Sequence, residues 1–231
     1  MVKFSRLVTE QRWIKEIDIN PLLASPERLI ALDARVVVYG KDTDRSELPR
    51  LAIRPYPAHY EKQIALRDGS RITVHPIRPE DEPLLVNFHH TLSERTVYMR
   101  YFHWMKLEQR IAHERLTRMC FIDYDRQMAF VAEYHDPRTG EPQIVAVGRL
   151  VKSHAAEEAE LAVIVADRFQ KRGIGTEIVR QLVDFARDEK LERITATVLF
   201  ENRPMQKLFA RLGFRKAQAA DGESLEVELV L

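Results

Sequence analysis

Hydrophobic residues recur along the chain with two different periods. Six segments alternate apolar and polar positions or are rich in β-branched residues, as strands do: residues 71–77, 128–132, 144–151, 160–165, 194–198 and 225–231. Four other segments repeat their apolar residues every three or four positions, as amphipathic helices do: residues 79–88, 107–119, 176–186 and 204–212. This order of strands and helices predicts an α/β domain with a mixed sheet flanked by helices.

The N-terminal part of the chain has a different pattern. Two apolar stretches, Trp13–Ile19 and Leu29–Tyr39, are separated by proline-containing turns and predict a pair of strands. The sequence then becomes polar and afterwards proline-rich between Gly40 and Pro57. We therefore expect three parts: a small β-rich unit over residues 1–48, a linker over 49–64 and the main domain over 65–231.

Composition and charge limit the classes of partner. Of the 231 residues, 45% are hydrophobic and 31% charged, which is typical of a globular chain. Lysine and arginine number 36 against 35 acidic residues, so no overall field favours a nucleic acid or an anionic membrane. The single cysteine, Cys120, cannot form an internal disulfide or a zinc site by itself. With no apolar run near the roughly 20 residues of a membrane helix, we expect a cytoplasmic protein.

A glycine loop follows the strand that ends at Val165. Its sequence is Gln-Lys-Arg-Gly-Ile-Gly over residues 170–175, and a predicted helix begins at Thr176. Gly173 and Gly175 permit a close approach of backbone N–H groups to an anion, and the helix N-terminus adds partial positive charge. The spacing fits neither the Walker loop nor the three-glycine dinucleotide fingerprint, which disfavours ATP and NAD. The alternative is an ordinary glycine turn between a strand and a helix.

The loop and the segments around it resemble a known family. The pattern Gln-x-x-Gly-x-Gly is similar to the acetyl-CoA signature of the GNAT family of N-acetyltransferases, and the likeness extends over residues 65–231. Residues 159–163, residues 167–170 and the helical segment 93–102 resemble the protein-lysine acetyltransferases of the Pat type, whose acetyltransferase domain is fused to ADP-forming acyl-CoA synthetases. Residues 16–21 and 31–35 resemble the ATP-grasp part of such synthetases. The resemblance implies a GNAT fold with a mixed, mostly antiparallel sheet, and an ATP-grasp remnant before it.

The resemblance also implies which residues hold acetyl-CoA, the expected co-substrate. The strand backbone at Val163 and Val165 matches the family's contacts to the pantetheine arm, and Asn202 matches an asparagine near it. The pyrophosphate contacts fall on the signature loop: Gln170, Lys171, Arg172, Gly173, Gly175 and Thr176. No metal is expected.

Transfer of an acetyl group to an amine needs a base, because an amine such as lysine is almost fully protonated at neutral pH. Glu160 lies on a predicted strand face with Ala162 and Ile164, so we expect a carboxylate among apolar neighbours, where burial favours the protonated form. By the resemblance, Glu160 matches the family's catalytic glutamate. The alternatives are a merely solvated Glu160 and a base at Glu201.

Two further positions bear on the mechanism. Many family members have a tyrosine as general acid seven residues after the asparagine, where this chain has Phe209, so no general acid is assigned. Cys120 lies among apolar residues, as inert cysteines do, so we expect direct transfer and no acetyl-cysteine.

Three groups of residues have a weaker functional interpretation. Glu16, Asp18 and Asn20 share a strand face that would hold Mg²⁺ in a complete ATP-grasp fold, but the piece is too short and we expect it to be inactive. The histidines at 89, 90 and 103 lack metal-ligand spacing. The last group could line an acceptor pocket or belong to the core: Tyr98, Arg100, Tyr101, Phe102 and Trp104.

Together these features predict an acetyl-CoA-dependent N-acetyltransferase that modifies a lysine of a protein. By the resemblance, the first candidate acceptor is an acyl-CoA synthetase. Two alternatives stay open at the level of the sequence. The acceptor could be a small amine, or the domain could sense acetyl-CoA without catalysing transfer. Neither a nucleic acid nor a membrane is expected as a partner.

Overall fold

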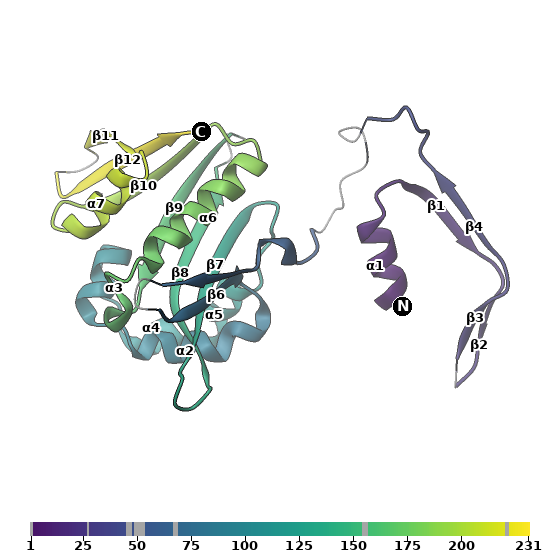
Figure 1. Cartoon of the computed structure of the whole chain (residues 1–231), viewed down its shortest axis with the longest axis horizontal. Coiled ribbons are helices and arrows are strands. Elements are labelled where there is room, and N and C mark those ends of the chain that lie inside the picture. The colour runs from purple at the N-terminus through teal and green to yellow at the C-terminus, as the bar shows by residue number, and fades with distance from the viewer. Residues whose placement is uncertain are drawn as a thin grey trace. The chain divides into compact units, whose positions relative to one another are not determined.

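The computed structural model describes residues 2–26, 28–44, 48, 54–66, 69–153, 157–219 and 222–231. The chain forms two compact units that divide between Pro55 and Tyr56 (Figure 1). Of the helices within the described ranges, none is both long and apolar enough to cross a membrane.

The first unit is small and built from hairpins. Helix α1 (Val2–Glu10) precedes four short strands: β1 (Ile14–Ile19), β2 (Leu22–Ala24), β3 (Leu29–Ala31) and β4 (Ala34–Val38). Strand β1 pairs antiparallel with β4, and β2 pairs antiparallel with β3. The predicted strand pair is therefore present, with each predicted stretch contributing to the pairing of β1 with β4. Helix α1 is an addition that the sequence pattern did not indicate.

The second unit is organised around one sheet of eight strands in the order β11-β12-β10-β9-β8-β7-β6-β5. Its strands are β5 (Lys62–Ala65), β6 (Arg71–Pro76), β7 (Gln127–His135), β8 (Pro142–Lys152), β9 (Glu158–Val165), β10 (Arg193–Leu199), β11 (Arg215–Ala219) and β12 (Ser224–Val230). All neighbours pair antiparallel except β9 and β10, which are parallel. This confirms the expected mixed, mostly antiparallel sheet.

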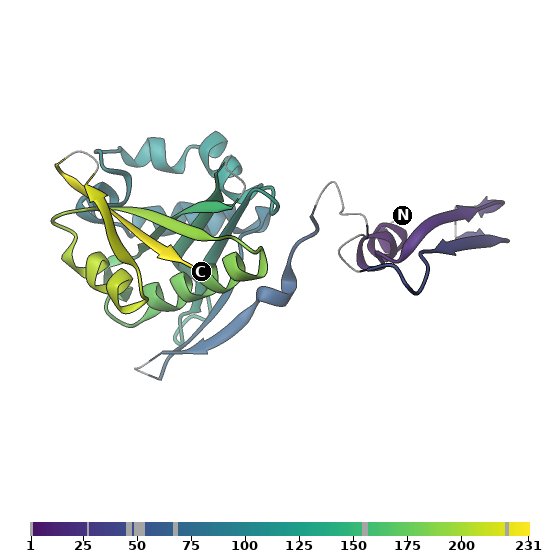
Figure 2. The same cartoon turned by 90° about the horizontal axis from the view of Figure 1, so that it is seen from above.

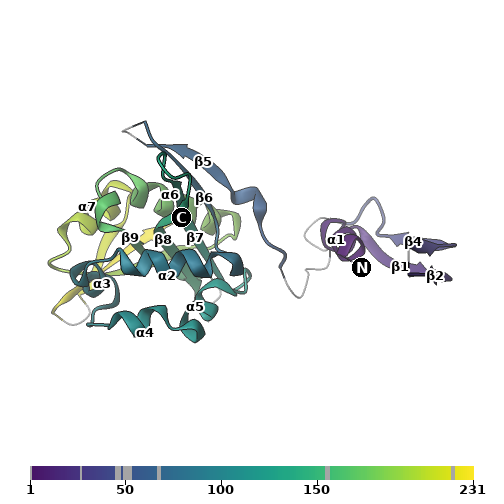
Figure 3. The same cartoon turned by 90° about the horizontal axis from the view of Figure 1, so that it is seen from below.

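Helices cover both faces of this sheet. One face carries α2 (Glu82–His90), α3 (Glu94–Tyr101), α4 (Leu107–Ile111) and α5 (His113–Cys120), and α6 (Ile174–Asp188) crosses the other. Figure 2 shows the strands between the teal helices and the green α6, and Figure 3 shows α2 to α5 from their own side. Helix α7 (Arg203–Arg211) follows β10. Three short 3-10 turns complete the unit: η1 (Ala58–Tyr60), η2 (Pro79–Asp81) and η3 (Asp167–Phe169).

Helix α6 packs on the sheet through the predicted apolar stripe. Ile178, Val179, Leu182, Val183 and Ala186 are all buried. Gly148 of strand β8 lies directly under α6, where an added Cβ would overlap Ile178. The missing side chain therefore lets the helix lie close to the strands that carry the site.

The structure differs from the predicted pattern in three places. Residues 58–60 and 62–64, expected in the linker, form η1 and most of β5, and Tyr60 is buried with its hydroxyl donating to Asp188 Oδ2 at 2.8 Å. The helix predicted over 107–119 is divided at Ala112, whose ψ of 128° is extended. Strand β11 was not predicted because the only apolar residues in the sequence Arg215–Ala219 are two alanines, which have low strand propensity.

Candidate active site

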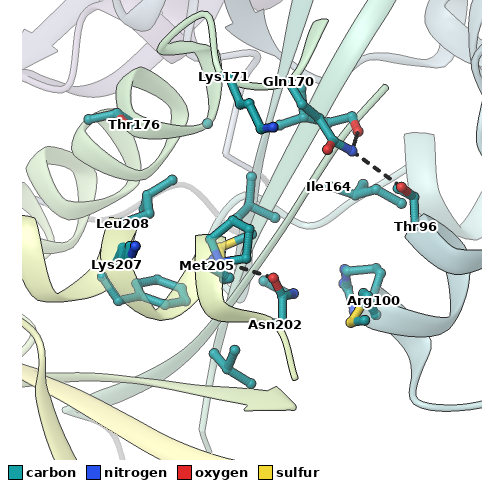
Figure 4. Close-up of a pocket in the computed structure, with 18 of the residues that line it drawn as sticks. Thr96, Arg100, Ile164, Gln170, Lys171, Thr176, Asn202, Met205, Lys207 and Leu208 are labelled. Atoms are coloured by element: carbon teal, nitrogen blue, oxygen red, sulfur yellow. Dashed lines mark hydrogen bonds between the residues drawn. The ribbon is translucent and has the colours of Figure 1, made fainter. Parts of the chain in front are cut away.

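A cavity of about 680 Å³ opens where strands β9 and β10 separate. The two strands pair only at Glu158, Ala159 and Glu160, opposite Arg193 to Thr195. Both continue beyond this point, β9 to Val165 and β10 to Leu199. The gap between them is bordered by β9, β10, the loop before α6, and helices α3 and α7 (Figure 4).

The edge of β9 that faces this gap presents backbone groups without a sheet partner. Strand β9 pairs with β8 as far as Val165, and Ala166 N–H donates to Val145 O at 2.9 Å. Because backbone groups alternate in direction along a strand, those of Leu161, Val163 and Val165 point away from β8, into the gap. An extended ligand with amide groups could therefore pair with this edge as a strand would.

The glycine loop closes one end of the cavity. Lys171 and Gly173 both have positive φ, 63° and 95°, and the first helical bond of α6 runs from Glu177 N–H to Gly173 O. The N–H groups of Ile174, Gly175 and Thr176 therefore have no acceptor within the helix and are available to an anion. A Cβ on Gly175 would lie only 3.3 Å from Leu208 Cδ1 and 3.4 Å from Val165 Cγ2. The loop has the geometry of an anion site.

Asp167 joins this loop to the start of α3. Its carboxylate accepts the Ser93 N–H at 2.9 Å, the Ser93 hydroxyl at 2.7 Å and the Thr96 hydroxyl at 2.8 Å. Burial alone would raise the pKa of Asp167, but these hydrogen bonds outweigh it and the pKa is lowered. Gln170 adds a second link, because its Nε2 donates to Val165 O at 3.1 Å and to Thr96 Oγ1 at 3.2 Å (Figure 4).

Glu160 lies at the point where the two strands part. It is the last β9 residue paired with β10, and its side chain lines the cavity. The expected burial is wrong: Glu160 is exposed, because the neighbouring face of β9 opens into the cavity instead of packing under a helix. Arg100 of α3 interacts electrostatically with this carboxylate. Glu201, the alternative base, is also exposed and lines the same cavity.

The structure brings nearly all predicted site residues to this one cavity. Those that line it together with Glu160 are Val163, Val165, Gln170, Lys171, Gly173, Gly175, Thr176 and Asn202. The exception is Arg172, whose guanidinium lies over the Phe169 ring, 5.0 Å from its centroid. Asn202 also caps α7, accepting the Met205 N–H at 3.3 Å. Phe209 is buried against Phe214 and presents no hydroxyl to the cavity.

The other sequence candidates divide between the cavity and the rest of the unit. Burial raises the pKa of the Cys120 thiol to about 12, and Cys120 does not line the cavity. Of the helical aromatic group, Arg100 and Phe102 line the cavity, whereas Trp104 is exposed and stacks on Tyr98 at 4.9 Å between ring centroids.

Sequence reasoning missed three cations that line the cavity: Arg95, Lys207 and Arg211. Lys207 and Arg211 are four residues apart on α7, so helical spacing after Asn202 would have placed them on one face.

A sheet gap with a free strand edge beside a helix N-terminus can hold an extended ligand that carries amide groups and a pyrophosphate, as an acyl-CoA does. A family model for the acetyltransferase (GNAT) domain matches residues 71–215, and the chain belongs to this family. A model for the ATP-grasp domain matches residues 1–38, which confirms the expected ATP-grasp fragment.

Relatives and solved structures agree with this membership. An acetyltransferase of Pseudomonas aeruginosa is 31% identical over 150 residues, which cover 65% of this chain and 78% of the relative. Acetyltransferase Pat of Mycolicibacterium smegmatis is 30% identical over 151 residues, covering 65% of this chain and 43% of Pat. The GNAT domain of PAT from S. lividans matches with a TM-score of 0.69 and 27% identity, over 77% of this chain and all of that domain.

A solved structure with lower sequence identity shares the fold of this chain. It is RimJ of Mycobacterium smegmatis in complex with CoA-disulfide, with a TM-score of 0.58 and 21% identity, over 74% of this chain and 86% of that one. This match shows the shared fold, and membership of the acetyltransferase (GNAT) family makes the protein an acyltransferase with an acyl-CoA co-substrate.

Proposed function

We propose that the protein is an acetyl-CoA-dependent N-acetyltransferase that modifies a lysine side chain of a protein, with Glu160 as general base. The observation that carries this proposal is the position of Glu160, at the closed end of the β9–β10 gap, while the glycine loop lies at the other end of β9. A donor stretched between the two would bring its reactive end to a carboxylate.

The chain's own groups account for three parts of an acetyl-CoA molecule: the pyrophosphate, the pantetheine arm and the thioester. The N–H groups at the start of α6 and the side chain of Lys171 are available to the pyrophosphate. The β9 edge at Val163 and Val165 can exchange hydrogen bonds with the pantetheine amides. Asn202 lies on the opposite wall, at the start of α7. The thioester then lies near Glu160.

Glu160 has one task in this scheme. It accepts a proton from the lysine ammonium, so that the neutral amine can attack the thioester carbonyl. A C–N bond forms, the C–S bond breaks and CoA leaves as a thiolate. The second proton that the nitrogen loses on becoming an amide passes through solvent to this thiolate, and Glu160 returns its own proton to solvent. With a reference thiol pKa near 8.5, the thiolate is a good leaving group, so the phenyl ring of Phe209 in place of a tyrosine is compatible with transfer.

A protein acceptor is supported by the similarity to Pat acetyltransferases and by the ATP-grasp fragment beside the GNAT domain. The first acceptor to test is the active-site lysine of an acyl-CoA synthetase. Acetylation would remove its charge and its capacity to bind an anionic substrate.

The test replaces Glu160 by glutamine, which keeps the shape of the side chain and removes its basicity. Glu160→Gln is expected to bind acetyl-CoA as the wild type does and to lose about 10²–10⁴-fold in kcat. CoA-thiol release with a panel of acyl-CoA synthetases and with small amines measures transfer. Glu157→Gln, an exposed carboxylate before β9, is the matched control and is expected to retain activity.

Each outcome assigns the function differently. Wild-type rates in Glu160→Gln would contradict its role as base and direct the same test to Glu201. Transfer to small amines alone would replace the protein acceptor. Acetyl-CoA binding with no transfer to any acceptor would make the domain a sensor.

A further inference from the structure

A second cavity, of about 370 Å³, lies on the face of the sheet that carries α3 and α5. Four arginines from three elements line it: Arg100 of α3, Arg115 and Arg118 of α5, and Arg149 of β8. Among the described residues of its lining, Glu114 is the single carboxylate residue. We call this the arginine cavity.

In the described part of the chain, no carboxylate oxygen lies within 4.0 Å of any of the four guanidinium groups. Arg100 interacts with the Glu160 carboxylate only at longer range. Arg149 donates to Met119 O at 2.7 Å, which uses one of its five N–H donors. The buried Nε of Arg115 has no hydrogen-bond partner. Most donors of the cluster are therefore free to bind an added anion.

Packing holds these cations in place without neutralising them. The guanidinium groups of Arg100 and Arg115 both lie over the Tyr101 ring, at 5.0 and 5.1 Å from its centroid. Burial lowers the pKa of Arg100 and of Arg149, and the mutual repulsion of the two cations adds to the lowering for Arg149. Both remain charged at neutral pH, since arginine does not deprotonate in proteins. Partly desolvated cations without an ion pair are costly, and an oxyanion relieves that cost.

The arginine cavity adjoins the reacting end of the active site. Arg100 lines both cavities. Arg149 pairs with Ala162 across β8 and β9, while Glu160 pairs with Val151, so Arg149 and Glu160 are diagonal neighbours on one face of the sheet. Such neighbours lie about 7–8 Å apart. The glycine loop belongs to the opposite end of β9, so an anion here is separate from the pyrophosphate of the donor.

We propose that the arginine cavity binds a carboxylate of the acceptor and so selects lysines that have an acidic residue close by. This inference rests on the proposed function, because it assumes that an amine reaches Glu160. An extended chain advances about 3.3–3.6 Å per residue, so the acidic residue is expected within about four positions of the lysine. Arginine forks bind planar carboxylates through paired hydrogen bonds, which makes glutamate and glutamine distinguishable.

The test uses labelled peptides with one central lysine in a neutral background. Each peptide pair carries glutamate or glutamine at one position, up to about four residues on either side. Binding to the full chain is measured by fluorescence anisotropy with CoA present, which needs no turnover, and acetyl transfer is measured separately. At one or two neighbouring positions, the glutamate peptide is expected to bind roughly tenfold tighter than its glutamine twin.

Two variants connect this preference to the cavity. Arg115→Gln with Arg118→Gln is expected to abolish the preference while acetyl-CoA affinity and melting temperature are retained. Arg180→Gln with Arg187→Gln removes the same two charges from α6, on the other face of the sheet, and is expected to keep the preference.

The outcomes separate this inference from the function on which it rests. Equal binding of both peptides at every position, or a preference that survives the double variant, would overturn the carboxylate site even if transfer occurs. A glutamate preference without any transfer would support the site and contradict the proposed function. A third measurement uses succinyl-CoA, whose acyl group carries a carboxylate on the donor. If the arginines of the cavity raise the affinity for succinyl-CoA but no peptide pair shows a glutamate preference, the proposal that the cavity binds a carboxylate of the acceptor would be overturned.

Discussion

At the scale of single residues, Gly148 determines how closely α6 lies on β8. A Cβ at this position would overlap Ile178 Cγ2 and lie 3.0 Å from Leu182 Cδ1. Ile178 and Leu182 are both buried in the core, so the added methyl group has no free space. Gly148→Ala is therefore expected to lower the free energy of unfolding by about 1–3 kcal/mol. Urea unfolding of Gly148→Ala measures this loss.

A second substitution makes the test of Gly148 specific. Ile178→Ala alone is expected to cost about 2–5 kcal/mol by leaving a cavity. In the double variant the new alanine methyl occupies part of that cavity, so the two losses should be clearly less than additive. Additive losses would contradict the overlap.

The sequence could predict those site residues that lie close together along the chain. Gly173 and Gly175 lie in one short loop, so a local pattern was sufficient for them, whereas Asn202 was identified through the family resemblance. The exposure of Glu160 could not be predicted, because the cavity beside it depends on where β10 diverges. Arg100 and Arg149 come from distant segments and meet only in the folded sheet.

At the scale of elements, Asp167 connects η3 to the N-terminus of α3. Its pKa is lowered in the folded protein, so its contribution to stability is present above the unfolded pKa of about 3.9 and is lost as pH falls through the folded value. Asp167→Asn is expected to be less stable than the wild type at neutral pH. The difference should shrink steadily as the solution is acidified below about pH 4.

Denaturant unfolding across the acid range measures this difference. Asp184→Asn, an exposed carboxylate on α6 that pairs with Arg187 at 3.6 Å, is the control for a general charge effect. A stability difference for Asp167→Asn that stays constant down to acid pH would show that its hydrogen bonds do not favour the ionised carboxyl.

Elements with a strong period were predicted from the sequence, and weak ones were not. The apolar stripe of α6 and the alternating apolar residues of β9 and β10 correspond to buried faces. In these elements the hydrophobic pattern of the sequence therefore matches the side chains that pack in the core. Strand β5 was assigned to the linker because its residues, Lys62–Ala65, include only two apolar positions. It joins the sheet through backbone pairing with β6, which leaves little trace in side chains.

At the scale of the whole molecule, the site is a property of the second unit, residues 56–231. One wall comes from α3, early in this unit, and the other from β10 and α7, near its end, while β9 and its loop lie between them. A donor bound in the gap would therefore contact segments far apart in sequence. Binding would stabilise this unit as a whole, since a ligand held only by the folded state raises its stability.

The most direct test of this account is calorimetric titration of the full chain with acetyl-CoA. Gly173→Asp and Gly173→Asn carry the same backbone strain at φ 95°, where a Cβ meets open space, but only aspartate adds a charge beside the expected pyrophosphate. The account predicts saturable binding by the wild type and an affinity for Gly173→Asp roughly tenfold or more below that of Gly173→Asn. No binding by the wild type, or equal affinities of the two variants, would contradict it.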